Sequence, residues 1–334
     1  MMKLYKIMFF NSMILGTLIS ISSSSWILSW IGLEINLLSI IPLMKNYHSK
    51  SHSEASIKYF IIQAFSSALL LFSVIIFINL NIEFMNFFSS LLINTALLLK
   101  MGAAPFHFWL PEVISGLNWE MIFIVLTWQK IAPMILLSYT LYSPMFLSII
   151  IILSSLIGGI QGINQMCLRK IMAYSSISHM SWMISALLNS ASIWTCYFII
   201  YSIINLNILI IFYKYNIYYI KQLSKLFSFN KKIKFMFMLN FLSLGGLPPF
   251  LGFFPKWMTM NFMIKNNFYT LALLLTIITL ISLFFYLRMS FSSFTINSEE
   301  SILINYKKVY YFNFMANMLS LMSLILCTII TNYF

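Results

Sequence analysis

The chain has 334 residues, of which 61% are hydrophobic and only 8% are charged, and its formal net charge is +13. A soluble protein carries about 25% charged residues, so this composition excludes a soluble globular domain and indicates a polytopic membrane protein. The positive charge does not indicate nucleic-acid binding, because the lysines lie in short loops between apolar runs and not on one basic face.

Apolar runs that are long enough to cross a bilayer follow one another along the whole chain. A spanning helix needs about 20 mostly apolar residues, and eleven segments meet this requirement. We therefore predict an all-α polytopic membrane protein with 11 transmembrane helices. The ninth segment is too long for one straight helix. The predicted segments are 4–22, 25–44, 57–79, 88–105, 119–142, 145–166, 171–189, 193–213, 234–264, 269–289 and 309–331.

The basic residues between these segments support the number of helices. Positive loops gather on the cytoplasm-like side of a membrane. If the loops alternate from the N-terminus, sixteen basic residues fall on the N-terminal side and only Lys265 falls on the opposite side. Adding or removing one helix in the middle of the chain would mix the two groups. We therefore expect the N-terminus on the cytoplasm-like side and the C-terminus on the opposite side.

Two of the predicted helices are interrupted by the same short pattern. Residues 102–112 and 246–256 both read as Gly, two residues, Pro-Phe, four residues, Pro and a charged residue. Helices broken by Gly and Pro at corresponding positions of two halves mark the site of many transporters. The breaks lie in the fourth and ninth helices, and a repeat of five helices must be inverted because five is odd. We predict repeats at 1–142 and 143–289, followed by a linker and last helix at 290–334.

Four charged residues lie inside predicted helices and away from the helix ends: Glu34, Lys100, Lys130 and Lys256. The first three fall near the bilayer midplane by residue count, whereas Lys256 falls closer to an interface. A charge at the bilayer centre costs at least ~2.5 kcal/mol and is functional by default. The alternatives are a structural ion pair or a side chain that reaches to the interface. Burial favours a neutral lysine and a nearby carboxylate favours a charged one, so a Glu34 that approaches or leaves Lys100 could load and unload a proton.

Two further ionisable residues each fit more than one role. His179 lies among serines in the seventh helix, in AYSSISHMSWM. It could be a hydrogen-bonded packing residue or a proton relay. Glu112 occupies the position in the first pattern that Lys256 occupies in the second, and it could act in transport or simply end a helix or contact another subunit.

No cofactor or metal is expected in this chain alone. The three cysteines are scattered, without the paired spacing of a metal or iron–sulfur site. The four histidines form no helical pair suited to haem or zinc, and no dinucleotide-binding glycine pattern, P-loop or nucleophile elbow is present.

Five motifs, in order, resemble the subunit 2 family of NADH dehydrogenase, the mitochondrially encoded antiporter-like membrane subunits of respiratory complex I. The resemblance runs nearly end to end and includes all four buried charges. It implies the shortened animal form of a fourteen-helix fold that lacks the first three helices. The motifs are WIGLEINLLSIIP (30–42), LLLKMGAAPFHFWLPEV (97–113), TWQKIAPM (127–134), LRKIMAYSSISHMSWM (168–183) and LSLGGLPPFLGFFPKW (242–257).

The resemblance implies a role for each buried charge. Glu34 is implied to pair with and tune Lys100, Lys130 to pass protons along the midplane, and Lys256 to take the exit-side position. NADH, FMN, iron–sulfur clusters and ubiquinone are implied to bind other subunits of the complex. The implied partners are other membrane-arm and accessory subunits, in the mitochondrial inner membrane with the N-terminus in the matrix and the C-terminus in the intermembrane space. The basic loop 214–234 is a candidate site for an anionic lipid such as cardiolipin.

Two other functions compete with proton translocation in complex I. A stand-alone cation/proton antiporter would share the broken-helix plan, although such proteins often place acidic residues where a cation binds and this core is rich in lysine. A purely structural spacer would retain its buried charges without using them.

Overall fold

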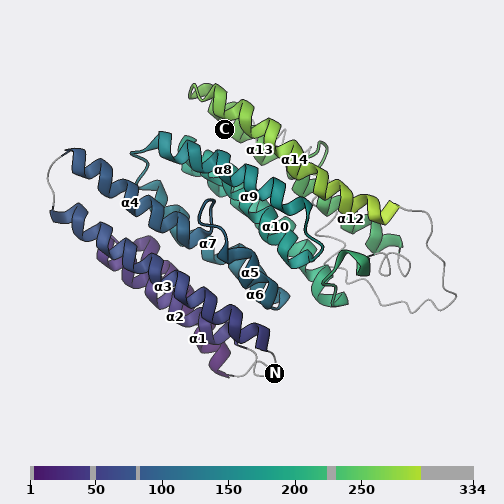
Figure 1. The fold of residues 1–334 in the computed structure, drawn as a ribbon, viewed down its shortest axis with the longest axis horizontal. Coiled ribbons are helices and arrows are strands. Elements are labelled where there is room, and N and C mark those ends of the chain that lie inside the picture. Colours follow the sequence, from purple (N-terminus) through teal and green to yellow (C-terminus); the bar gives the residue numbers. More distant parts are fainter. Residues whose placement is uncertain (1–3, 46–49, 80–82, 224–230, 295–334) are drawn as a thin grey trace. The chain divides into compact units, whose positions relative to one another are not determined.

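The structure is a computed structural model that describes residues 4–45, 50–79, 83–223 and 231–294 (Figure 1). Over these residues the chain is helical, and the only β pairing among them is one isolated antiparallel bridge between Cys167 and Tyr219. The helices are α1 Leu4–Ser22, α2 Trp26–Met44, α3 Lys50–Asn79, α4 Glu83–Met101, α5 Trp109–Gly116, α6 Trp119–Leu126, α7 Trp128–Ser138, α8 Pro144–Ile163, α9 Leu168–Asn189, α10 Ala191–Tyr215, α12 Lys231–Gly245, α13 Phe253–Lys265 and α14 Tyr269–Phe294.

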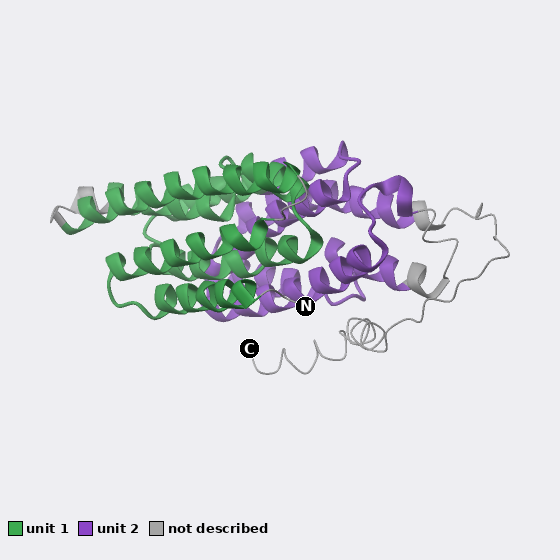
Figure 2. Cartoon of the chain, turned by 90° about the horizontal axis from the view of Figure 1, so that it is seen from below, with its two compact units in different colours: residues 1–154 green, residues 155–334 purple. Residues whose placement is uncertain are grey.

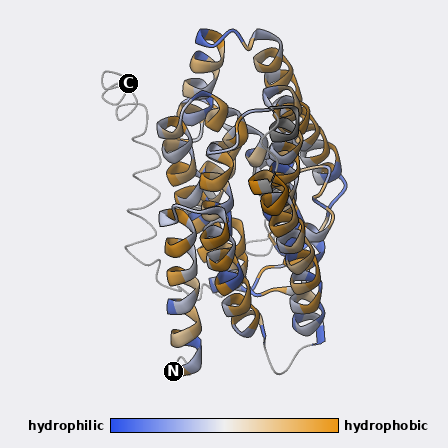
Figure 3. Ribbon diagram, turned by 90° about the vertical axis from the view of Figure 1, so that its left-hand side faces the viewer, coloured by the Kyte–Doolittle hydropathy of each residue, from blue (hydrophilic) through white to orange (hydrophobic). Residues whose placement is uncertain are grey.

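Each of the first ten predicted segments coincides with a helix or with two consecutive helices. The last predicted segment, 309–331, and the predicted C-terminal part 290–334 lie outside the described residues from position 295 onward. Apolar residues occur along the whole length of most helices (Figure 3). Among the described residues, seven helical stretches are long and apolar enough to cross a membrane.

α9 does not qualify as a span by hydropathy, although the sequence predicts one at 171–189. Serines and His179 lower its mean hydropathy. Nearly every residue from Leu168 to Leu187 is nevertheless buried within the protein. A helix that is surrounded by other helices does not need an apolar surface toward lipid, so a hydropathy window underestimates it.

Several predicted boundaries differ from the structure by a few residues, and two of the differences have a clear structural cause. α3 begins at Lys50, not at 57, because its polar first turns pack against protein: the backbone of Ser51 lies directly against Gly116 of α5. The segment predicted as one helix over 119–142 is interrupted at Thr127 and ends at Ser138. Hydropathy marks only the apolar part of a helix, so it reveals neither the polar first turns of α3 nor the interruption at Thr127.

The chain divides into two compact units, residues 1–154 and 155–334 (Figure 2). In the first unit, α1 packs along α2, α2 and α4 flank α3, and α5 rests on α3. In the second unit, α9 packs against α10 and α13, and α12 packs against α14.

Helices α1 and α2 of the first unit approach each other closely. A methyl group added at Gly16 would lie 2.8 Å from the Asn36 backbone nitrogen, and one added at Gly32 would lie 2.6 Å from the Ser20 nitrogen. These two glycines let the backbones touch, as small residues do in membrane helix pairs. The contact fixes the position of α2, the helix that carries Glu34.

Candidate functional site

The first helix break begins where α4 ends at Met101. Gly102 has a φ of +73°, its backbone N–H donates to Leu99 O at 3.2 Å, and the N–H of Ala103 donates to Leu98 O at 3.1 Å. These paired bonds are those of a Schellman C-cap, which favours glycine because the left-handed conformation strains other residues.

Side chains from within the first unit satisfy the carbonyls that this break frees. Trp109 Nε1 donates to Leu99 O at 3.1 Å, and Gln63 Nε2 of α3 donates to Lys100 O at 3.2 Å. Both of these side chains are nearly fully buried. A membrane provides no water for unpaired backbone groups, so a broken helix is stable only where protein or a hydrated cavity supplies partners.

The second break repeats this backbone geometry. Gly246 has a φ of +75°, its N–H donates to Ser243 O at 3.0 Å, and the N–H of Leu247 donates to Leu242 O at 3.3 Å. The turns that follow also correspond, with Phe106 N–H donating to Ala103 O at 2.8 Å and Phe250 N–H donating to Leu247 O at 2.9 Å. The 104–105 and 248–249 peptide bonds are both cis.

Lys256 caps the second break with its own ammonium group. It lies in the first turn of α13, is 9% exposed, and its Nζ donates to Gly245 O at 2.8 Å. Nζ also lies 5.9 Å from the centre of the Trp182 ring. A methyl group at Gly246 would lie 2.7 Å from Lys256 Cδ, so this glycine also leaves room for the lysine to fold back over the break.

Lys100 is the buried lysine of the first break. It occupies the last turn of α4, is 6% exposed and interacts electrostatically with Glu34. The two side chains do not form a direct salt bridge, since the one ion pair within 4.0 Å among the described residues involves other groups. Oε1 of Glu34 is buried without a hydrogen-bond partner. A carboxylate oxygen is thus available near a lysine without being bound to it.

A polar bridge connects α2, α3 and α7 in the first unit. Gln129 Nε2 donates to Asn36 Oδ1 at 2.8 Å, and the Tyr59 hydroxyl donates to Gln129 Oε1 at 3.4 Å. Asn36 is two residues after Glu34, and Gln129 is the residue before Lys130. The bridge therefore holds the helices of two predicted site residues together.

Lys130 lies just after an interruption of the segment 119–142, which the sequence predicts as one helix. It is 2% exposed in α7, and its backbone N–H donates to Thr127 O at 3.1 Å. Thr127 binds Phe123 O through both its N–H, at 3.0 Å, and its hydroxyl, at 2.6 Å. Such hydroxyl bonding bends helices, and Pro133 removes one more helical donor. The Thr-x₅-Pro spacing in TWQKIAP is the signal that could have revealed the break.

His179 of α9 lies in a cluster of tyrosines in the second unit. Nδ1 is 2.9 Å from the Tyr197 hydroxyl, Nε2 is 3.5 Å from the Tyr286 hydroxyl, and the Tyr201 ring centroid is 5.2 Å away. The imidazole is 6% exposed. Both ring nitrogens therefore face groups that can either donate or accept a hydrogen bond.

Glu112 differs from its counterpart Lys256, because it lies at an exposed surface. Its Oε2 is 2.7 Å from Lys58 Nζ, and the two side chains are 58% and 50% exposed. The structure thus places Glu34, Lys100 and Lys130 in the first unit and His179 and Lys256 in the second, with Glu112 at the surface of the first.

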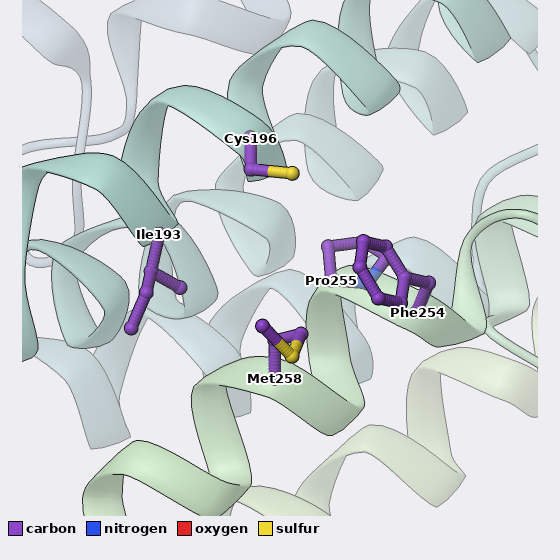
Figure 4. A pocket seen from close by; sticks show the side chains of 5 residues that line it. All are labelled: Ile193, Cys196, Phe254, Pro255 and Met258. Atoms are coloured by element: carbon purple, nitrogen blue, oxygen red, sulfur yellow. The ribbon is translucent and has the colours of Figure 1, made fainter. Parts of the chain in front are cut away.

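No ligand set for a metal ion is found in the described part of the chain, where no three His, Cys, Asp or Glu residues gather. A small, partly open hollow lies against α13 (Figure 4) and is lined by Ile193, Cys196, Phe254, Pro255 and Met258. It offers none of the oxygen ligands that hard cations require, so it is not a cation site.

The sequence of residues 23–282 matches the family model of the NADH:quinone oxidoreductase/Mrp antiporter transmembrane proteins. The chain belongs to this family. Within the NADH:quinone oxidoreductase/Mrp antiporter family, it is 47% identical over 305 residues to NADH-ubiquinone oxidoreductase chain 2 of Anopheles gambiae, covering 90% of this chain and 89% of the relative.

Solved structures show the same fold at low sequence identity. A chain of respiratory complex I from Thermus thermophilus has a TM-score of 0.86 and 22% identity, over 97% of this chain and 78% of that chain. A chain of the Mrp complex from Dietzia sp. has a TM-score of 0.71 and 15% identity, over 83% of this chain and 58% of that chain. The described helices thus adopt the antiporter-like fold of the family.

Proposed function

We propose that this chain is a proton-translocating membrane-arm subunit of NADH:ubiquinone oxidoreductase, complex I. The observation that carries the proposal is its 47% identity, over nine-tenths of its length, to NADH-ubiquinone oxidoreductase chain 2 of Anopheles gambiae. The chain performs no redox chemistry itself. NADH, FMN, iron–sulfur clusters and ubiquinone belong to other subunits.

The buried charges of the two units carry the proton in this proposal. Lys100 takes and releases a proton as its distance from Glu34 changes, since the unpartnered Glu34 oxygen can accept a bond that it does not make in this arrangement. Lys130 passes the proton onward, His179 relays it, and Lys256 releases it. The carbonyl of Gly245 stabilises the charged form of Lys256, as expected at a helix C-terminus.

The inverted repeat of five helices is part of the same proposal. Its support is the correspondence of the two breaks in glycine conformation and in three hydrogen bonds. In a chain of 11 transmembrane helices with repeats at 1–142 and 143–289, the N-terminus faces the matrix and the C-terminus the intermembrane space of mitochondria. The basic residues predicted on the N-terminal side support this orientation.

Other subunits of complex I and membrane lipid are the partners that this function requires. The basic stretch 214–234, predicted as a loop, includes the end of α10 and the start of α12. It remains a candidate for an anionic lipid headgroup, although residues 224–230 lie outside the described structure. Lys214 and Lys221 lie among the described residues of this stretch. They provide positive charge next to aromatic residues suited to the membrane interface.

A stand-alone cation/proton antiporter is the second candidate, favoured by the shared fold with the Mrp chain from Dietzia sp.. Blue-native electrophoresis of detergent-solubilised membranes, with in-gel NADH oxidation and mass spectrometry of the active band, distinguishes the two. We expect this chain in a large NADH-oxidising band. Migration alone or as a small oligomer without that activity would overturn the complex I assignment and direct the next assay to sodium and potassium exchange.

A further inference from the structure

A polar stripe runs along α10 in the second unit. Tyr197, Tyr201 and Asn205 are spaced by four residues, so they lie on one face of the helix and extend for about 12 Å at 1.5 Å per residue. Their exposed fractions are 2%, 2% and 1%. The stripe is therefore enclosed by protein and not turned toward lipid.

The stripe meets the site at His179. The Tyr197 hydroxyl is 2.9 Å from His179 Nδ1, and the Tyr201 ring lies beside the imidazole. The Tyr201 hydroxyl also interacts with Ser176 of α9 and with Asn205. Hydroxyl groups thus extend from the histidine toward the carboxyl-terminal half of α10.

Asn205 is the member of the stripe that protein groups leave unsatisfied. Neither Nδ2 nor Oδ1 has a hydrogen-bond partner of ordinary geometry, although the residue is 99% buried. Buried amides are almost always bonded to protein or to ordered water. Tyr201 and Asn205 interact without meeting the geometry of a direct hydrogen bond, and a water that bridges the two side chains would satisfy the amide.

We propose that ordered water beside Asn205 joins Tyr201 and Tyr197 in a proton-conducting file that leads from the carboxyl-terminal half of α10 to His179. Each water or hydroxyl accepts a proton on its oxygen and releases another to the next group, so the number of protons on each group is unchanged after a transfer. The O–H groups then rotate back before the next proton passes. Asn205 exchanges no proton; its amide donates to and accepts from the water and thereby positions it. The conduction of protons rests on the proposed function, whereas the hydration of the file does not.

Cysteine accessibility in the assembled complex tests the hydration directly. In a background with Cys167, Cys196 and Cys327 replaced by alanine, Asn205→Cys is exposed to the small polar thiol reagent 2-aminoethyl methanethiosulfonate. Only a hydrated, ionised thiol reacts quickly. We expect labelling about tenfold faster than for the control Ile204→Cys, since Ile204 is the preceding residue and is equally buried at 2% exposure. Equal rates overturn the proposal.

The proton yield tests whether the file conducts. In the intact complex, Asn205→Leu is expected to lower the number of protons moved per NADH oxidised to the level found for Lys130→Met. Asn205→Ser can still bind water, so it is expected to keep the yield of the unmodified complex. Labelling at position 205 without any loss of yield in Asn205→Leu overturns conduction. If Lys130→Met also keeps the full proton yield, the proposed function fails. The labelling rate of Asn205→Cys still decides whether the file is hydrated. Should Asn205→Leu fail to assemble, Tyr201→Phe takes its place.

Discussion

The first break places its buried lysine before the turn, at Lys100 in the last turn of α4, whereas the second places it after the turn, at Lys256 in the first turn of α13. The backbones of the two turns are otherwise alike in glycine conformation and in hydrogen bonding. At the first break Gln63 and Trp109 cap the freed carbonyls, so Lys100 is not needed for that purpose. At the second break Lys256 itself is the cap on Gly245.

This difference separates the structural and the ionisable roles of a lysine. Lys100 can change its charge without uncapping a helix, and Glu34 lies nearby to respond to it. Lys256 is bound to a carbonyl, so its movement also breaks a backbone cap. The same turn therefore holds a lysine near a carboxylate in one unit and ties a lysine to a backbone carbonyl in the other.

The largest effect is expected from a side chain added to the glycines of the two turns. Gly246→Ala and Gly102→Ala both force a left-handed conformation, at a cost of about 1–2 kcal/mol. At Gly246 the new methyl group also meets Lys256 at 2.7 Å, whereas at Gly102 its nearest neighbour is the Leu110 side chain at 3.1 Å. The amount of assembled complex on native gels should fall further for Gly246→Ala. Equal losses would show that Lys256 does not fold over the second turn.

The caps of the two breaks should respond differently to loss of their donors. Gln63→Leu leaves the Lys100 carbonyl buried and unpaired, which costs about 1–3 kcal/mol. The heat stability of the complex should therefore fall, while the proton yield per NADH of the assembled fraction stays unchanged.

Lys256→Gln keeps an N–H donor for Gly245 but cannot carry a proton. Its complex should be stable and its proton yield reduced; a normal yield would contradict the role of Lys256.

The break at Thr127 is a feature of the first unit, since α14, at the corresponding place in the predicted second repeat, is continuous over Tyr269–Phe294. Thr127→Val removes the hydroxyl bond to Phe123 O and should cost about 0.5–1.5 kcal/mol. Thr259→Val is the matched control, because Thr259 makes a 2.8 Å hydroxyl bond to Lys256 O within the continuous helix α13. Both should lower heat stability similarly, and Thr127→Val alone should lower the proton yield by displacing Lys130.

The smallest effect is expected at Glu112, the counterpart of Lys256. Its ion pair with Lys58 is exposed, and exposed pairs contribute little to stability. Glu112→Gln should leave both assembly and proton yield indistinguishable from those of the unmodified complex. A loss of yield comparable to that of Lys256→Gln would place Glu112 in the transport path after all.

The sequence predicts the helices well because the membrane imposes length and apolarity on each of them. It also locates both glycine turns, since a left-handed residue and a proline leave a local signature. It does not reveal that Gln63 caps the first break and Lys256 the second, because those bonds join residues 37 and 11 positions apart. The burial of α9 and the exposure of Glu112 likewise depend on which helices pack beside them.

The most direct test of the account is the number of protons moved per NADH oxidised in sealed membrane vesicles that contain Lys130→Met. Lys265→Met, at the exposed end of α13, is the control, and both variants are first checked for an intact NADH-oxidising band. We expect a lower proton yield for Lys130→Met and an unchanged yield for Lys265→Met. A full yield from an assembled Lys130→Met complex would contradict this expectation and leave this chain as a structural spacer.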